Sequence, residues 1–293
     1  MSAVLQVVGG GFPGLVRAVE EARRGARVEY LEPRLRAGGA MATESFLSPF
    51  RFNLGPSLVR RPPLPSLHVL EPQLLLDVAG ATLTRATLSA GGGGELRSAF
   101  ALLCGVDPAS AEAVDEACAA ADDLVLVSGG NGLAASCLLD ELVAGGSTVV
   151  EGIGDVDPGP APGDGLGICR LFAGVRGGAR PDRALATAVG FTGEPSLRGR
   201  LDALRTGDVD EPLGFLVSNA HLDANLVDPD VWSFVFQGVL PFGAEISRAG
   251  YTERVLGALD IDPADVIFRL LWLPEDTGES LMLVSSCAAS PSS

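Results

Sequence analysis

VLQVVGGGFPGLVRAVEEARRGARVEYLE, residues 4–32, is the most informative part of this chain. It opens with an apolar run, Val4–Val8, which predicts a buried strand and continues directly into a glycine-rich turn. A helical pattern follows the turn, because apolar residues recur three and four positions apart at Leu15, Ala18, Val19 and Ala22. A second apolar run, Ala26–Leu31, predicts another buried strand. The segment is therefore expected to form a strand–helix–strand unit.

The turn and the end of the second strand carry the chemistry of this unit. Gly9, Gly11 and Gly14 satisfy a G-x-G-x-x-G pattern, in which the glycines permit a tight turn, close approach of a pyrophosphate and close helix–strand packing, respectively. The start of the helix offers unpaired N–H groups and a positive dipole end to phosphates. Glu32 follows Gly14 by 18 residues, where an acid accepts hydrogen bonds from a ribose. This order predicts a dinucleotide-binding unit; a glycine-rich turn without a nucleotide is the alternative.

The residues that follow Glu32 narrow the choice of dinucleotide. They read PRLRAGGA over residues 33–40 and FRFNLGPSL over residues 50–58. This pattern resembles the superfamily of flavin-dependent amine oxidases, and FNLGPSL resembles most closely its phytoene desaturase and carotenoid isomerase branch. The resemblance implies FAD rather than NAD. It also implies further cofactor contacts, with Arg34 on the adenosine half, Gly38 and Gly39 near the pyrophosphate, and Gly55 and Pro56 near the flavin ring.

A second segment resembles the same branch. SGGNGL, residues 128–133, opens a predicted helix, and a strand over residues 148–152 leads to Val156. In the family this segment re-enters the cofactor domain, and its valine touches the adenine through the backbone. The resemblance implies an α/β fold in which a Rossmann-type FAD/NAD(P)-binding domain interleaves with a smaller, mainly β substrate domain. The cofactor domain would comprise residues 1–59 and 125–157, and the substrate domain residues 60–124 and 158–293.

The rest of the chain alternates short strand-like and helical patterns. Strands are expected over residues 67–70, 74–78 and 82–88 as a meander, and later over 166–175, 184–191, 213–218, 231–240 and 280–286. Helices are expected over residues 95–103, 108–122, 196–205 and 252–259.

Composition excludes several classes of function. The net charge of −16 disfavours nucleic acid and anionic membrane surfaces as partners. All 21 basic residues are arginine, which removes lysine Schiff-base chemistry and indicates a GC-rich bacterial coding sequence. With only two histidines and no C-x-x-C pattern, we expect no metal site. The five cysteines lie in apolar surroundings, which is typical of a protein in a reducing cytoplasm. We expect no signal peptide, because the first strand begins by residue 4 without a basic stretch before it. We expect no transmembrane segment, because no run of 18 apolar residues occurs.

The chain also departs from the pattern of the family it resembles. The C-terminal flavin segment, a strand followed by Gly-Ala-x-x-x-x-Pro-Gly, is missing from the sequence. A flavin site would then be partly open, and we expect a second copy or a longer homologue to cover it. Arg17 and Glu21 on the first helix are the candidate contact face; a solvated i,i+4 ion pair is the alternative.

The resemblance implies a flavin-dependent desaturase that acts on an extended apolar polyene, free or carrier-bound. A redox-neutral cis–trans isomerase of a polyene is one alternative, and a cofactor-free scaffold or partner subunit is another. His221 and Asp223 are weak catalytic candidates, because they lie in the link between two predicted substrate-domain strands where the family has an acid. An exposed pair of loop residues explains them equally well.

Overall fold

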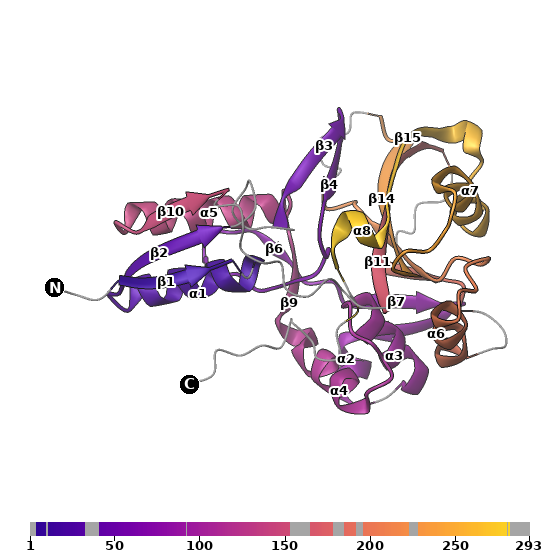
Figure 1. Cartoon of the computed structure of the whole chain (residues 1–293), viewed down its shortest axis with the longest axis horizontal. Helices are drawn as coiled ribbons and strands as arrows, with labels where there is room; N and C mark the ends of the chain where they lie inside the picture. Colours follow the sequence, from indigo (N-terminus) through magenta and orange to yellow (C-terminus); the bar gives the residue numbers. More distant parts are fainter. Residues whose placement is uncertain are drawn as a thin grey trace.

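The computed structural model describes residues 4–9, 11–32, 41–91, 93–152, 165–177, 185–191, 196–222, 228–279 and 281. It confirms the predicted α/β class, with a Rossmann-like unit joined to a sheet-rich second part (Figure 1). The Rossmann-like unit holds the indigo N-terminal elements, and the second part holds the orange and yellow C-terminal ones.

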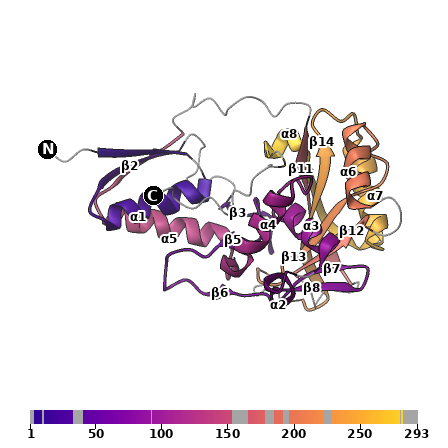
Figure 2. The ribbon, with the colours of Figure 1, turned by 90° about the horizontal axis from the view of Figure 1, so that it is seen from below.

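A parallel three-stranded sheet forms the centre of the first unit. Its order is β1 (Val4–Val8), β2 (Arg27–Glu32) and β10 (Thr148–Glu151), so segments far apart in the sequence share one sheet. Helices α1 (Gly11–Arg23) and α5 (Asn131–Ala144) lie side by side against it (Figure 2). Leu15, Val19 and Leu138 are buried between these elements, as the helical pattern of the sequence predicts.

A small antiparallel group of strands extends the core of the first unit. β9 (Leu124–Val127) pairs with both β5 (Val59–Arg60) and β6 (Val69–Leu70). Val59, Val125 and Val127 pack into the same buried cluster as helices α1 and α5. The exact boundaries of the two domains, including the division at residues 59–60, stay a prediction.

The second part is built on a seven-stranded sheet. Its order is β15 (Val266–Trp272), β11 (Leu166–Arg176), β14 (Val231–Pro241), β13 (Gly214–Ser218), β12 (Ala186–Val189), β7 (Leu74–Val78) and β8 (Ala81–Thr84). All neighbours run antiparallel except β12 and β7. The long strands β11 and β14 are buried along almost their whole length because both faces of the sheet are covered.

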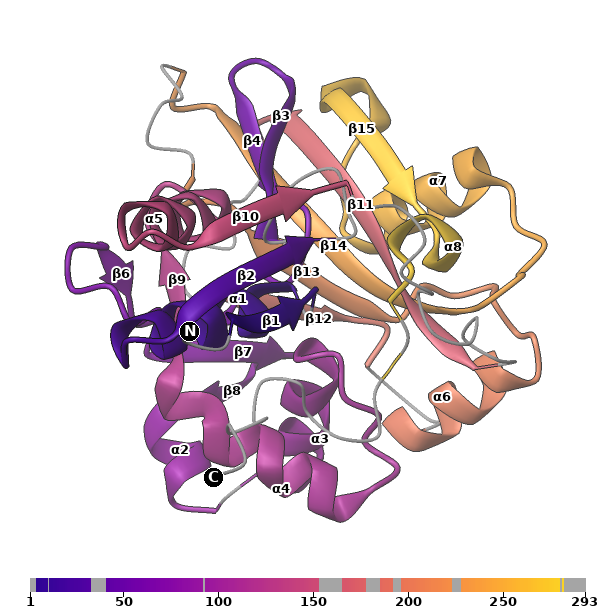
Figure 3. The same cartoon turned by 60° about the vertical axis from the view of Figure 1, so that its left-hand side comes forward.

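Two groups of helices cover this sheet (Figure 3). α2 (Arg85–Ser89), α3 (Gly94–Leu103) and α4 (Ala111–Ala119) lie on one side, and α7 (Arg248–Ala258) lies on the other. α6 (Leu197–Arg205) packs into the same buried cluster as α3, and the short α8 (Pro274–Thr277) contacts β11. Phe100 of α3 belongs to one buried cluster and Tyr251 of α7 to another. Each cluster joins its helices to one face of the sheet.

A hairpin of β3 (Thr43–Leu47) and β4 (Phe50–Asn53) connects the two parts. Its aromatic rings stack on the large sheet. The ring centroid of Phe46 lies 5.4 Å from that of Phe172 on β11 and 5.9 Å from that of Phe268 on β15. Phe52 completes this cluster, with its centroid 5.6 Å from Phe172. Such offset and edge-on pairs add to the stabilisation from burial.

Four sequence predictions of secondary structure need correction. The strand expected over residues 82–88 ends at Thr84, whose hydroxyl accepts a hydrogen bond from the N–H of Thr87 and begins α2. Residues 67–70 do not form a meander with β7, because β6 pairs with β9 instead. The helix expected over residues 108–122 is α-helical only from Ala111 to Ala119. The helix expected over residues 252–259 begins earlier, at Arg248, because the Ser247 side chain caps it.

Two further segments complete the comparison. Strand β15 is absent from the sequence predictions, and it is a half-exposed edge strand whose run of apolar residues is interrupted by Arg269. The final strand expected over residues 280–286 lies outside the described residues, apart from Leu281. Within the described part of the chain, no helix is long and apolar enough to cross a membrane.

The aromatic cluster predicts a large effect of one substitution. Phe52→Ala should lower the free energy of unfolding by about 3–5 kcal/mol, because the side chain is fully buried and its removal leaves a cavity. Leu47→Ala is the matched control on the same hairpin, because Leu47 is 44% exposed and its loss should cost less than about 1 kcal/mol. Urea unfolding measures both variants. Equal losses would show that the hairpin is not held by its aromatic face.

Candidate functional site

The glycine turn has the geometry that its sequence predicts. Gly9 and Gly11 both have φ of 56°, in the left-handed region that glycine tolerates best. A Cβ atom at Gly14 would collide with the carbonyl oxygen of Gly9, so helix α1 packs against the turn only because residue 14 has no side chain. α1 starts at Gly11 and carries no acid in its first turn. Its positive dipole end is therefore available to an anion.

Glu32 lies at the end of β2, beside this turn. Its side chain is almost completely buried, and its Oε2 accepts a hydrogen bond of 2.9 Å from the hydroxyl of Tyr30. The Tyr30 hydroxyl also lies 3.4 Å from the carbonyl oxygen of Gly11. Tyr30 was missed by the sequence reasoning, although the two-residue spacing places it on the same face of β2 as Glu32. The tyrosine thus fixes the acid next to the glycine turn.

The segment Gly55–Pro56 is fixed by the start of helix α5. The side-chain Nδ2 of Asn131 donates a 2.7 Å hydrogen bond to the carbonyl oxygen of Pro56. The backbone N–H of Asn131 in turn donates to the Oδ1 of Asn53, at 2.9 Å. The N–H of Gly132 donates to the hydroxyl of Thr43, also at 2.9 Å. Hairpin side chains therefore satisfy N–H groups that the first turn of a helix leaves unpaired.

The glycines that open α5 serve this packing. Gly130 has a left-handed φ of 99°, and a Cβ at Gly132 would lie only 2.8 Å from the backbone nitrogen of Thr43. The helix can thus meet the hairpin backbone directly. The carbonyl oxygen of Gly129 accepts a 3.0 Å hydrogen bond from Nη2 of Arg51. SGGNGL therefore joins the first unit to the hairpin, and the segment that re-enters the first unit is α5 with β10.

His221 is placed against the same cluster. Its Nε2 lies 3.5 Å from the Nδ2 of Asn53, and burial lowers the pKa of His221 to about 4. The imidazole is therefore neutral at neutral pH and accepts from the amide. His221 does not line the cavity described below. Its predicted companion Asp223 lies outside the described residues, as do Arg34, Gly38, Gly39 and Val156.

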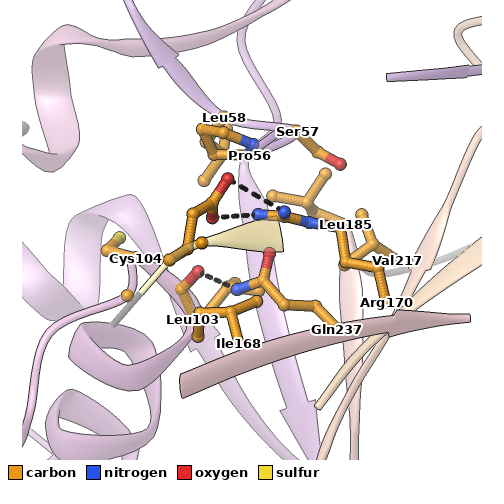
Figure 4. A pocket seen from close by; sticks show the side chains of 13 residues that line it. Pro56, Ser57, Leu58, Leu103, Cys104, Ile168, Arg170, Leu185, Val217 and Gln237 are labelled. Carbon is orange, nitrogen blue, oxygen red and sulfur yellow. Dashed lines mark hydrogen bonds and ion pairs between the residues drawn. The ribbon is translucent and has the colours of Figure 1, made fainter. Parts of the chain in front are cut away.

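A cavity of about 330 Å³ lies between the segment Gly55–Pro56 and the large sheet (Figure 4). Its wall combines the tight loop around Pro56, the end of α3 and one face of β11, β13 and β14. The cavity is lined by apolar residues, among them Pro56, Leu58, Leu103, Ile168, Leu185 and Val217, and by the polar residues Arg170, Gln237 and Glu279. The cavity is thus mainly apolar with a few convergent polar groups, which is the usual composition of a small-molecule site.

The polar residues of the cavity were missed by the sequence reasoning. Arg170 and Gln237 each interrupt a long apolar run, which is an unusual position for a polar side chain in a buried strand. Arg170 Nη1 and Nη2 donate to the two carboxylate oxygens of Glu279, at 3.0 and 2.6 Å. The position of Arg170 and Gln237 inside apolar runs could have identified them from the sequence. Nothing in the sequence singles out Glu279, because it follows α8 and contacts Arg170 only in the folded protein.

The predicted contact face on α1 differs from expectation. Glu21 forms an ion pair with Arg24, with 2.6 Å between Oε1 and Nη1, and does not pair with Arg17. An i,i+3 pair replaces the i,i+4 pair because both spacings bring side chains together on a helix surface. This exposed pair is worth little to stability. A role of the Arg17/Glu21 face in binding a partner stays a prediction.

Comparisons with known proteins agree with this architecture. Residues 7–70 match the family model described as an NAD(P)-binding Rossmann-like domain. No curated protein sequence matches the chain. Among solved structures, the PF1083 protein from Pyrococcus furiosus aligns with a TM-score of 0.59 at 12% identity, over 92% of this chain and 88% of that chain.

Two further solved structures align over most of their lengths. An oxidoreductase from Methanosarcina mazei has a TM-score of 0.55 at 9% identity and covers 98% of this chain and 91% of that chain. Reduced UDP-galactopyranose mutase has a TM-score of 0.59 at 12% identity and covers 93% and 83%, respectively. At these identities the likeness shows the fold alone. The chain is thus a two-part α/β protein with a Rossmann-like unit and a sheet-rich second part.

The lowered pKa of His221 predicts a pH dependence of stability. Between pH 6.5 and 4 the unfolded chain binds a proton at His221 that the folded chain does not, so the free energy of unfolding falls as the pH falls through this window. The loss should be on the order of 3 kcal/mol at most. His221→Gln removes the titrating group and with it this pH dependence, whereas the control His68→Gln, at an exposed position, leaves the pH dependence in place. Urea unfolding at pH 7 and pH 4.5 measures this loss for each protein. Equal losses for wild type and His221→Gln would contradict the assignment of the pH dependence to His221.

Proposed function

We propose that this protein is a flavin-dependent oxidoreductase. In this proposal FAD lies across the glycine turn, and its flavin ring reaches the segment Gly55–Pro56 beside the cavity. The observation that carries the proposal is the position of this segment, because Pro56 is both a wall of the cavity and a partner of Asn131 on helix α5. One short stretch of chain therefore links a nucleotide-binding unit to a ligand-sized cavity.

The described residues fit such a cofactor. Gly9 and Gly11 have left-handed φ values, Gly14 packs directly against the Gly9 carbonyl, and the turn leads into the N-terminus of α1, which is the arrangement that a pyrophosphate requires. Glu32 supplies a carboxylate at the end of β2 for the ribose. The Oδ1 of Asn131 is a buried acceptor without a hydrogen-bond partner among the described residues, and it belongs to the side chain that holds Pro56. A polar donor at the ring end of the cofactor would satisfy it.

The remaining cofactor contacts belong to the same proposal. Arg34 would contact the adenosine half, Gly38 and Gly39 the pyrophosphate, and Val156 the adenine. When bound, the flavin supplies a two-electron acceptor that can take a hydride from a substrate carbon. The chain's own residues would position the substrate and exclude water, because the cavity wall is mainly apolar and includes five leucine, isoleucine and valine side chains. His221 is neutral and away from the cavity, so we assign it a positioning role through Asn53.

The finer proposal is desaturation of a polyene, as in the phytoene desaturase branch that the sequence resembles. The apolar wall of the cavity supports an apolar ligand. A volume of about 330 Å³ lies at the lower end of the usual range for small-molecule sites, so the cavity would hold one end of a long chain. Incubation with candidate polyenes separates the reactions: a red-shifted product marks desaturation, whereas an unchanged mass with altered retention marks isomerisation. No change in spectrum, mass or retention would overturn the polyene assignment.

A partner chain and a reducing cytoplasm are also part of the proposal. Among the described strands, β1 lies at one edge of its sheet, and Val4 and Val8 on it are 47% and 50% exposed. Open parallel edges of this kind are normally covered, so a second copy or a longer homologue would lie here. Cys104, Cys118, Cys137 and Cys169 are free thiols, which supports a reducing compartment.

FAD binding by one glycine variant tests the proposed function. The purified protein should be yellow or should bind added FAD stoichiometrically. Gly14→Ala should weaken FAD binding by at least about tenfold, because the new methyl group displaces the turn from helix α1. Gly257→Ala is the matched control, because a Cβ there meets nothing within 4 Å. Absorbance and fluorescence titrations measure both variants. A colourless protein that binds no FAD would refute the flavoenzyme and favour a cofactor-free scaffold.

A further inference from the structure

A pair of polar side chains stands side by side on the floor of the cavity. Arg170 on β11 and Gln237 on β14 are directly opposite each other in the antiparallel register. Cross-strand partners project from the same face of a sheet with their Cβ atoms about 5 Å apart. Both residues line the cavity and are buried, with 2% and 6% of their surface exposed, respectively (Figure 4). Buried polar groups in such strands require an explanation.

Arg170 retains donors that Glu279 does not use. Its Nη1 and Nη2 atoms each give one N–H to Glu279, and its buried Nε–H has no hydrogen-bond partner among the described residues. A buried donor without a partner is unfavourable. An acceptor from a ligand in the cavity would pair with a guanidinium N–H that Glu279 does not use.

Gln237 provides the complementary acceptor. Its Nε2 donates a 2.8 Å hydrogen bond to the carbonyl oxygen of Leu103. A carbonyl can only accept, so this bond fixes which end of the amide is nitrogen and leaves Oε1 as the free end. No residue that the structure describes donates to Oε1. The floor of the cavity thus presents one donor and one acceptor next to each other.

The charge on this floor is already balanced. The guanidinium of Arg170 and the carboxylate of Glu279 form a two-pronged ion pair, which leaves no net charge for a ligand to neutralise. A carboxylate ligand would be repelled by Glu279, and an ammonium ligand by Arg170. An uncharged head group avoids both penalties.

We propose that the cavity binds a ligand with an apolar chain and an uncharged head group that both accepts and donates a hydrogen bond, namely a hydroxyl or a primary carboxamide. A guanidinium N–H of Arg170 that Glu279 does not use donates to the head group, and the Oε1 of Gln237 accepts from it. Leu58, Ile168 and Val217 contact the hydrocarbon part. The inference rests on the proposed function only in treating this ligand as substrate, because the binding itself needs no flavin.

A panel of probes with chains of equal length tests the head-group specificity. Hexan-1-ol, hexanamide, hexan-2-one, hexanoate and hexylamine are titrated into the full-length protein and followed by calorimetry or ligand-observed NMR. Hexan-1-ol or hexanamide should bind best. The ratio of their two affinities shows whether the site prefers a hydroxyl or a carboxamide head group. Hexan-2-one, which cannot donate, should bind about tenfold more weakly, a loss of ~1.4 kcal/mol. Hexanoate or hexylamine binding as tightly as the alcohol and the amide would overturn the proposal, as would binding of none of the probes.

Two variants test the assigned partners. Glu279→Gln removes the balancing charge and keeps the shape, so it should raise hexanoate affinity by at least about tenfold. Gln237→Leu removes the acceptor, so it should abolish the preference for hexan-1-ol over hexan-2-one. Glu211→Gln, which breaks an exposed ion pair with Arg200, is the matched control and should change neither result. A gain in stability cannot mimic these effects, because each is a change of selectivity between ligands.

The measurements separate this inference from the proposed function. FAD content is determined on every sample by absorbance. FAD binding without discrimination among the probes would overturn the head-group assignment alone. Discrimination among the probes in a protein that binds no FAD would overturn the flavoenzyme alone. If Glu279→Gln fails to fold, the wild-type panel and Gln237→Leu still decide the question.

Discussion

The side chain of Asn53 is the interaction on which the arrangement of the two parts depends. Its Oδ1 accepts hydrogen bonds from the Thr43 hydroxyl at 2.8 Å and from the N–H of Asn131 at 2.9 Å. Its Nδ2 faces the neutral ring of His221. One fully buried amide thus joins both strands of the hairpin to the first turn of α5 and to the end of the large sheet. An unpaired amide at this depth would be costly, so these four groups hold each other in one geometry.

The same face of the large sheet serves two purposes along its length. At one end, Phe172, Phe268 and Trp272 receive the aromatic hairpin. Next to them, Arg170 and Gln237 form the polar floor of the cavity. The hairpin ends in Asn53 and continues into Gly55–Pro56, so the packing that fixes the hairpin also fixes the wall of the cavity. Stability and site geometry therefore share the same contacts.

The sequence predicts local features of this protein well and tertiary ones poorly. The glycine turn was predictable because Gly9, Gly11 and Gly14 act through backbone geometry that neighbouring residues determine. The long strands β11 and β14 were predictable from continuous apolar runs. The strand expected over residues 82–88 failed because the Thr84 cap, a single side-chain hydrogen bond, outweighed β propensity.

The polar groups of the site could not be predicted from local sequence patterns. Arg170 and Glu279 are 109 residues apart in sequence, and only the fold brings them together. Tyr30 was not predicted as a site residue, because an aromatic residue in a strand is usually part of the core. Such partners depend on register and on long-range pairing, which no local pattern encodes. The resemblance of FNLGPSL to a known family placed Gly55–Pro56 as a ring contact, but it gave no information about the floor of the cavity opposite.

The central claim is that Gly55–Pro56 brings a flavin ring and the cavity ligand into contact. Flavin absorption is sensitive to the polarity and hydrogen bonding around the ring, so a difference spectrum of the FAD-loaded protein tests the claim most directly. Addition of hexan-1-ol or hexanamide should perturb the flavin bands and saturate at the concentration that saturates binding. Full occupancy of the cavity with an unchanged flavin spectrum would contradict the account.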